Sequence, residues 1–336
     1  MRVPEQIKKC VVFLGTESNS GQQLEFRATG FLVRIEDPQP DGPRYFNYLV
    51  TAKHVAKQLE GKNFAVRVNT RDGKSMLVHS DGGGANTKWF FHPTDAFADV
   101  AVFPWVSSDA FNADYVELLT AMFWDDFDDN FLWDALNQNA PEVIWPIIPT
   151  VKGIVRGNAS PLPTTVPEVL TARSGIPAIH EVMGIGDEVC IVGLFSYHKG
   201  TSKNHPILRT GNIAMMPDEP IQTSEGPMEA YLIEARSIGG LSGSPVFVRI
   251  ECQRADKTMQ HTWAFLGLIH GHWVTPTENI NDMTEQDAKG KMSLNTGIAI
   301  VTPGLKLLDI LYGEELKSMR RARIEAEQES NLPIPD

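Results

Sequence analysis

The chain has 336 residues, of which 42% are hydrophobic, so it is long enough for about two domains with buried cores. It carries 42 acidic and 30 basic residues, for a formal net charge of -12, and no stretch gathers enough Lys and Arg for a nucleic-acid surface. The composition therefore predicts a globular protein that binds no nucleic acid.

The first residues, MRVPEQIKKCVVFLG, hold an apolar run too short for the core of a signal peptide, and no small-residue cleavage site follows. No later segment has the roughly 20 apolar residues of a membrane span. We therefore expect a cytoplasmic protein with no membrane contact. The cysteines Cys10, Cys190 and Cys252 form no C-x-x-C pair, so we expect no disulfide or zinc ribbon, and each should pack as a small apolar residue.

Short apolar or alternating runs separated by turn residues fill positions 8–105, among them FRATGFLVRI, FNYLVTAKHV and DVAVFPW. A second set of such runs begins at DEVCIVGLF and continues through SPVFVRI and TWAFLGLIHGHW to TGIAIV. Short strands at regular spacing predict barrels or sandwiches. We expect an N-terminal β unit over 1–105 and a C-terminal β unit over 181–302.

Two segments differ in character from these β units. Residues 106–180 have mostly helical spacing with many acidic and aromatic residues, followed by a Pro-rich stretch. We interpret them as a connector or insertion that packs on the barrels; the alternatives are an inhibitory lid and a docking surface for a partner protein. The second segment is 303–336. Thr302 and Pro303 look like the N-cap and first residue of a helix that docks on a barrel, and residues 320–336 should be solvated or disordered.

Three separate blocks carry residue types that serine-based acyl transfer needs. His54 lies in YLVTAKHVAK, Asp99 in FADVAVFPW and Ser242 in GGLSGSPV. Such chemistry requires a base for the hydroxyl proton, a carboxylate that orients the base, and amide donors for the oxyanion. Alone, each block is equally typical of a structural histidine, a strand start or an ordinary turn. Asp95 competes with Asp99, but only Asp99 directly adjoins the alternating strand.

In this order the blocks resemble the trypsin-like, chymotrypsin-fold serine peptidases. The family's T-A-x-H block is similar to residues 51–54, its D-[IV]-A-[LV] block to residues 99–102, and its G-x-S-G-[GS]-P block to residues 240–245. ATGFLV, GDEVCIVGLF and FLGLIHGHW resemble the family's early strand, the first strand of its second barrel and its substrate-pairing strand. The resemblance covers both β units, but neither 106–180 nor the C-terminal segment.

The resemblance implies an all-β dominated fold of two six-stranded antiparallel β-barrels. It implies that His54 is the general base, that Asp99 orients it, and that Ser242 is the nucleophile. The backbone N–H groups of Gly240 and Ser242 would form the oxyanion hole. It also implies a protein or peptide substrate and no metal or organic cofactor.

The sequence departs from the secreted members of the family. Leu241 stands where secreted zymogen peptidases carry an Asp that pairs with a new N-terminus, so we expect no activation by that ion pair. The lack of disulfides favours the intracellular bacterial or HtrA-like branch, here without a PDZ domain.

Candidate substrate-binding residues are Arg236, His270, Gly271 and His272. Arg236 lies six residues before Ser242, and a cationic pocket there would favour Asp or Glu at P1, the substrate residue whose carbonyl is attacked. The alternative is that Arg236 faces solvent or pairs with a structural acid such as Glu234. His270 and His272 have the residue type of metal ligands but no third ligand at a convincing spacing, and we expect no metal.

We interpret the chain as a cytoplasmic serine endopeptidase that forms an acyl-enzyme on Ser242 and is controlled by a regulatory protein partner or a conformational switch. The alternative is a catalytically silent trypsin-like fold that acts as a protein-binding scaffold. An esterase of the α/β-hydrolase type is opposed by the chain order His, Asp, Ser and by the β-rich pattern.

Overall fold

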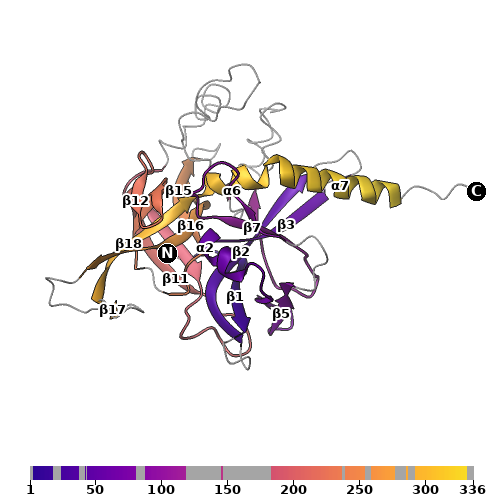
Figure 1. Cartoon of the computed structure of the whole chain (residues 1–336), viewed down its shortest axis with the longest axis horizontal. Helices are drawn as coiled ribbons and strands as arrows, with labels where there is room; N and C mark the ends of the chain where they lie inside the picture. The colour runs from indigo at the N-terminus through magenta and orange to yellow at the C-terminus, as the bar shows by residue number, and fades with distance from the viewer. Residues whose placement is uncertain are drawn as a thin grey trace, which may run out of the picture.

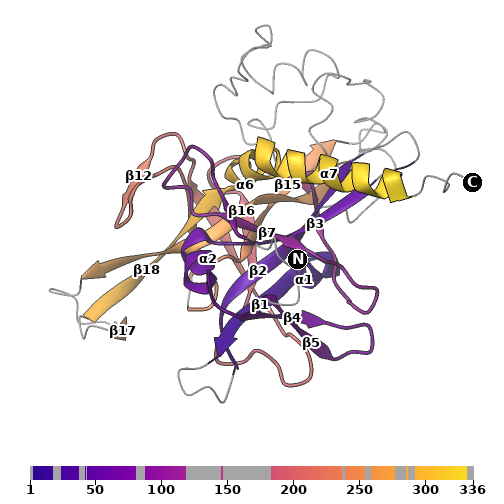
Figure 2. The same cartoon turned by 45° about the vertical axis from the view of Figure 1, so that its right-hand side comes forward.

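The structure, a computed structural model, describes residues 3–17, 24–37, 42, 44–80, 88–118, 145–146, 183–236, 239–253, 259–276, 285–286 and 292–330. Two β-rich halves lie side by side, and the C-terminal helices extend along one edge of the molecule (Figure 1). Helix α1 (Glu5–Lys9) precedes the first strand, and helix α2 (Lys53–Leu59) lies between the halves in both views (Figure 2).

The N-terminal half is one sheet, in the order β5-β4-β1-β2-β3-β7-β6, with β8 beside β2. Its strands are β1 (Val11–Glu17), β2 (Leu24–Asp37), β3 (Arg44–Thr51), β4 (Phe64–Asn69), β5 (Ser75–His79), β6 (Phe90–Phe91), β7 (Ala101–Trp105) and β8 (Val116–Leu118). All pairings are antiparallel except β2 with β8. Among the described residues no pairing joins β5 to β6, so this sheet does not close by hydrogen bonds.

The C-terminal half closes into a six-strand antiparallel barrel, because β18 pairs with both β14 and β16. Its strands are β10 (Glu188–Gly193), β11 (Ile207–Met215), β14 (Tyr231–Glu234), β15 (Pro245–Gln253), β16 (Met259–Pro276) and β18 (Met292–Pro303). Two short strands, β9 (Trp145–Pro146) and β17 (Glu285–Gln286), lie against β16 and β18. A separate hairpin joins β12 (Ile221–Thr223) to β13 (Gly226–Met228). The mostly β, chymotrypsin-like architecture expected from the sequence is therefore observed, except that among the described residues one barrel closes where two were expected.

One hydrophobic core connects the two halves. Phe31 of β2 and Phe265 of β16 are buried with ring centroids 5.4 Å apart, and Phe247 of β15 packs on the other side of Phe265 at 6.0 Å. Aromatic rings at these distances attract one another and stabilise the fold beyond the burial of their apolar surface. The halves therefore dock through apolar contact, and the site described below lies along the seam between them.

The C-terminal segment differs from the sequence-based expectation in two respects. Thr302 is not an N-cap, since it is still paired with Leu268 in β18, and helix α6 (Gly304–Leu311) begins after Pro303. Residues 320–330 lie in helix α7 (Glu314–Ser330), and most of those with described side chains are exposed as expected, but Arg320 and Ile324 are buried. Its Arg320 is buried and donates to the Tyr48 hydroxyl at 3.0 Å, so α7 is fastened to the N-terminal sheet.

Most of the predicted connector, including its acidic helical part, lies outside the described residues. Residues 106–118 are described, and their Phe111, Tyr115 and Val116 are buried against the N-terminal sheet. Cys10 and Cys190 are buried free thiols, as expected, and burial raises the pKa of both. Within the described part of the chain, none of the helices combines the length and apolar character needed to cross a membrane.

Candidate active site

The pairing of β3 with β7 brings His54 and Asp99 together. This pairing sets Thr51 opposite Ala101, so the chain leaving β3 and the chain entering β7 lie side by side. His54, in the first turn of α2, is 2.8 Å from Asp99 through Nδ1 and Oδ2, and its backbone N–H donates to Oδ1 at 2.9 Å. Asp95 does not take this place: its carboxylate accepts the backbone N–H of Phe97 at 2.9 Å and pairs with Lys306 at 3.0 Å.

Burial and hydrogen bonding set the charge of this pair. The Asp99 side chain is 2% exposed, and burial acts to raise its pKa. Hydrogen bonds from His270 and His54 outweigh burial and hold the pKa of Asp99 well below its ordinary value. Burial lowers the pKa of His54, but the hydrogen bond and charge of Asp99 more than offset it, so that pKa is raised above 6.5. Asp99 is therefore an anion that stabilises the protonated form of His54.

The loop that carries Ser242 is built on two glycines in left-handed conformations. Gly240 has a φ of 98° and Gly243 a φ of 80°, a region that side chains disfavour. The Thr29 hydroxyl of β2 donates to the Gly240 carbonyl at 2.7 Å, and the Thr29 N–H donates to the Ser242 carbonyl at 3.1 Å. The Ser242 loop is thus hydrogen-bonded directly to the sheet that carries His54 and Asp99.

Among the residues that the structure describes, two amides of the same loop have no acceptor. The N–H of Gly243 donates to the Ile269 carbonyl and that of Ser244 to the Leu241 carbonyl, each at 2.8 Å. Within the described part of the chain, the N–H groups of Gly240 and Ser242 donate to no other residue. A pair of unused amides beside a serine is the arrangement that an oxyanion hole requires.

The Ser242 hydroxyl donates to the backbone carbonyl of His270 at 3.4 Å. Among the hydrogen bonds between described residues, none joins this hydroxyl to His54. The structure therefore brings the three predicted residues to one site, with His54 and Asp99 in direct contact and the serine turned toward β16.

His270 occupies a place that the sequence did not suggest. We expected it to contact substrate, but its side chain is 14% exposed and its Nδ1 is 2.6 Å from Asp99 Oδ2, the oxygen that also contacts His54. Its ring meets that of His54 edge-on, with centroids 5.6 Å apart. No sequence signal pairs His270 with Asp99, because 171 residues separate them.

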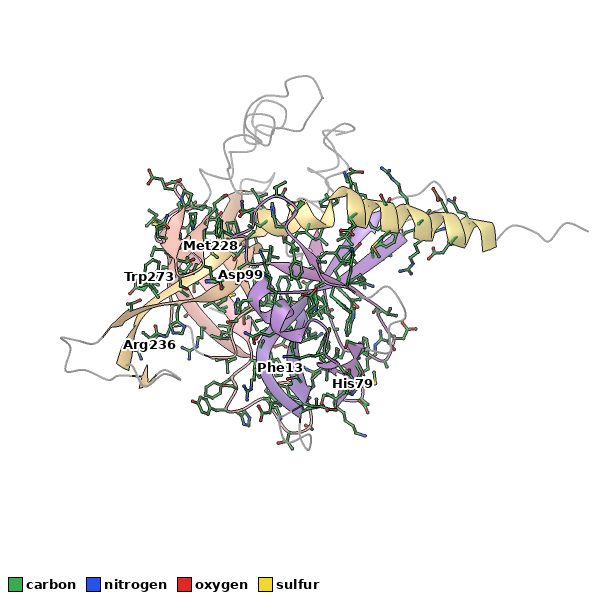
Figure 3. All side chains as sticks on the ribbon, in the orientation of Figure 1. Phe13, His79, Asp99, Met228, Arg236 and Trp273 are labelled. Atoms are coloured by element: carbon green, nitrogen blue, oxygen red, sulfur yellow. The ribbon has the colours of Figure 1, made fainter. Side chains whose placement is uncertain are left out.

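The other candidate substrate residues lie farther along β16 and β14. A Cβ at Gly271 would have nothing within 4 Å, so the face of the sheet is open at this residue, and His272 is half-buried. Arg236 is exposed, on the side of the C-terminal barrel and apart from Asp99 (Figure 3). An exposed guanidinium is solvated, so it gives no basis for a preference for acidic P1 residues.

One group of side chains has the composition of a metal site. Donor atoms of His54, Asp99 and His270 all lie within 4.8 Å of one another. A metal bound between the two Nδ1 atoms would need the lone pairs of both. The two short contacts to one carboxylate oxygen instead fit N–H donors, because a carboxylate oxygen only accepts hydrogen bonds. We therefore interpret the group as a hydrogen-bonded cluster.

The β12–β13 hairpin adjoins this site and was not anticipated from the sequence. A Cβ at Gly226 would lie 2.3 Å from the Phe97 ring, so the hairpin packs closely on the loop that leads to Asp99. The charge of the exposed Glu225 contributes to raising the pKa of His54. The hairpin therefore adds negative charge beside the predicted base.

The comparisons with known proteins give no family assignment. No family model matches the sequence, and no curated protein matches it significantly. The solved structures that are similar to the chain include the following two. The protease domain of MamO from Magnetospirillum magneticum, in its apo form, is 12% identical over 90% of this chain and 96% of that chain, with a TM-score of 0.41. Deg5 is 12% identical over 74% of this chain and 81% of that chain, with a TM-score of 0.37.

Proposed function

We propose that this protein is a serine endopeptidase that hydrolyses peptide bonds through an acyl-enzyme on Ser242. The observation that carries the proposal is the His54–Asp99 pair at 2.8 Å, with the Ser242 loop hydrogen-bonded to the same sheet through Thr29. His54 is the general base, Asp99 holds its tautomer, and the amides of Gly240 and Ser242 stabilise the oxyanion.

Acylation begins when the Ser242 hydroxyl turns from the His270 carbonyl toward Nε2 of His54. The oxygen attacks the substrate carbonyl carbon as its proton moves to Nε2, and the carbonyl oxygen becomes an oxyanion between the two amides. The carbon–nitrogen bond then breaks, and the proton on Nε2 passes to the leaving amine. Asp99 stabilises the imidazolium at each stage.

Deacylation repeats these steps with water as the nucleophile. His54 takes a proton from water, the resulting hydroxide attacks the ester carbonyl, and the Ser242 oxygen leaves with the proton held on Nε2. The buried Asp99 anion keeps Nδ1 of His54 protonated, which leaves Nε2 with a lone pair. This tautomer is the one that both half-reactions require.

An extended substrate has a strand edge to pair with. Ile269 is the last described residue of β16 whose backbone N–H and C=O both pair with the backbone of the Ser242 loop, through Gly243 and Ser244. Beyond it, β16 is paired with β18 on one side, whereas its pairing with β15 on the other side ends at Leu268. Addition of a peptide strand at this edge would carry a peptide carbonyl toward Ser242.

One observation favours the second candidate, a silent protein-binding scaffold. The Ser242 hydroxyl is bonded to a backbone carbonyl, an arrangement in which no base accepts its proton. A fold can keep its shape after its activity is lost. The two candidates differ in whether Ser242 reacts with an electrophile.

The test is covalent labelling with a fluorophosphonate, followed by intact-protein mass spectrometry. The endopeptidase proposal predicts one added label on the wild type and none on Ser242→Ala or His54→Ala. His79→Ala is the matched histidine control, because His79 is exposed on β5, and it should label as the wild type does. An unlabelled wild type would show that the isolated chain has no reactive Ser242, as both the scaffold and a fully restrained peptidase predict.

We further infer that the protein works in the cytoplasm and that a partner protein or a conformational switch restrains it, since an unrestrained peptidase would damage its surroundings. The orientation of the Ser242 hydroxyl supports the restraint, because a hydroxyl bonded to the His270 carbonyl is not bonded to the base. High constitutive cleavage of unfolded casein by the purified chain would contradict it.

A further inference from the structure

Asp99 is the centre of a cluster that is larger than the pair considered so far. Its buried carboxylate accepts three N–H groups: the His54 backbone at 2.9 Å on Oδ1, and the Nδ1 atoms of His54 and His270 at 2.8 and 2.6 Å on Oδ2. A carboxylate oxygen has about two lone-pair directions, so these two rings occupy the whole of Oδ2. His270 therefore competes with His54 for the same acceptor atom.

The backbone of His270 is held as firmly as its ring. The preceding residue, Ile269, accepts a hydrogen bond from the Gly243 N–H at 2.8 Å and donates to the Ser244 carbonyl at 2.9 Å. The His270 carbonyl then accepts the Ser242 hydroxyl at 3.4 Å. One residue of β16 thus contacts both Asp99 and Ser242.

We propose that His270 is a positioning residue of the active site, which shares the Asp99 carboxylate with His54 and thereby sets the pH at which His54 becomes a base. The catalytic meaning of this proposal rests on the proposed function, but the hydrogen-bond cluster itself does not.

The direction of the effect follows from the sharing of one oxygen. A carboxylate oxygen that already accepts a second N–H is a weaker acceptor for the first, so it stabilises the His54 imidazolium less. Removal of the His270 donor leaves Oδ2 to His54 alone and should make His54 easier to protonate. The charged and titratable groups that act on His54 among the described residues are Asp99, His270 and Glu225. Of these, only His270 competes for the acceptor.

Two substitutions at His270 distinguish the effect of its N–H donor from the effect of its ring volume. His270→Phe keeps the ring volume and removes the N–H, whereas His270→Asn places a neutral amide N–H near the position of Nδ1. Loss of one neutral hydrogen bond corresponds to about 0.5 to 1 pH unit in a titration midpoint. The Phe variant should therefore raise the His54 midpoint by about that amount, and the Asn variant should keep it within roughly 0.2 unit of the wild type.

The measurement is a pH titration of the imidazole nitrogens by NMR on the full chain with ¹⁵N-labelled histidine. His54 is assigned by loss of its signal in His54→Ala, and His79→Ala serves as the unrelated control. This readout needs no turnover, so it remains decisive if the chain proves to be a silent scaffold. An unchanged or lowered midpoint in the Phe variant, or equal shifts in the Phe and Asn variants, would overturn the proposal.

A second observation needs no substitution at His270. If both rings donate to Asp99, the wild type should show two strongly deshielded Nδ1–H protons, each coupled to a histidine nitrogen, and both should move when Asp99→Asn replaces the acceptor. A single such proton in the wild type would refute the sharing of Oδ2. In an active chain, the acid limb of kcat/KM should follow the NMR midpoint in each variant.

Discussion

The docking of the Ser242 loop on the N-terminal sheet predicts a large penalty for a methyl group at Gly243. An added Cβ would lie 2.2 Å from the Thr51 hydroxyl and 2.3 Å from the Thr29 carbonyl oxygen, and both contacts are too short for the sheet to remain in place. The φ of 80° adds strain of its own. Left-handed strain of about 1–2 kcal/mol and overpacking of about 1–3 kcal/mol give a loss of roughly 2–5 kcal/mol in the free energy of unfolding for Gly243→Ala.

Gly239→Ala is the matched control, because it lies in the same loop, has no left-handed φ, and its Cβ would have nothing within 4 Å. Urea denaturation followed by tryptophan fluorescence compares the two variants with the wild type. We expect the urea midpoint and the fluorophosphonate labelling both to fall for Gly243→Ala, and neither to change for Gly239→Ala. Equal stability of the two variants would refute the inference that this loop is packed against Thr29 and Thr51.

Three predictions concern the electrostatics of the site. The base must be neutral to accept a proton, and the pKa of His54 is raised. We therefore expect kcat/KM to fall as the pH is lowered, with a midpoint above 6.5 in a pH–rate profile. A midpoint below that value would contradict the assignment of His54 as the base. Glu225→Gln should lower the same midpoint, and the difference should shrink at about 1 M salt, where exposed charges are screened; a salt-independent difference would not fit a surface charge. Asp99→Asn should reduce kcat by about 10⁴-fold with little change in the fold seen by circular dichroism, and near-normal turnover would argue against its role.

The sequence was sufficient to predict where the strands and the three motif blocks lie along the chain, because each of them depends on a local residue pattern. Alternation marked β3 and β7, and the glycines on either side of Ser242 marked a turn that needs left-handed residues. The contact between His54 and Asp99 followed from the family resemblance and has a simple cause in the β3–β7 register. These features were available because the determining residues are close in sequence or in adjacent strands.

Other features depend on how the two halves meet, and no local pattern encodes that. His270 looked like a substrate residue on a strand, and only the seam between the halves brings its ring to Asp99. Thr302 resembled an N-cap because it precedes a proline, but pairing with Leu268 keeps it in the barrel. The end of the chain looked soluble by composition, yet Arg320 finds buried acceptors on Tyr48 and Leu311. In each case a long-range partner outweighed the local preference.

The central claim is that Ser242 hydrolyses peptide bonds with His54 and Asp99. The most direct measurement is to incubate the purified chain with a diverse peptide library and identify the products by mass spectrometry, beside Ser242→Ala prepared in the same way. The account predicts new peptide termini with the wild type and none with Ser242→Ala. Identical product lists for the two proteins, or cleavage of ester substrates without any peptide-bond cleavage, would contradict it.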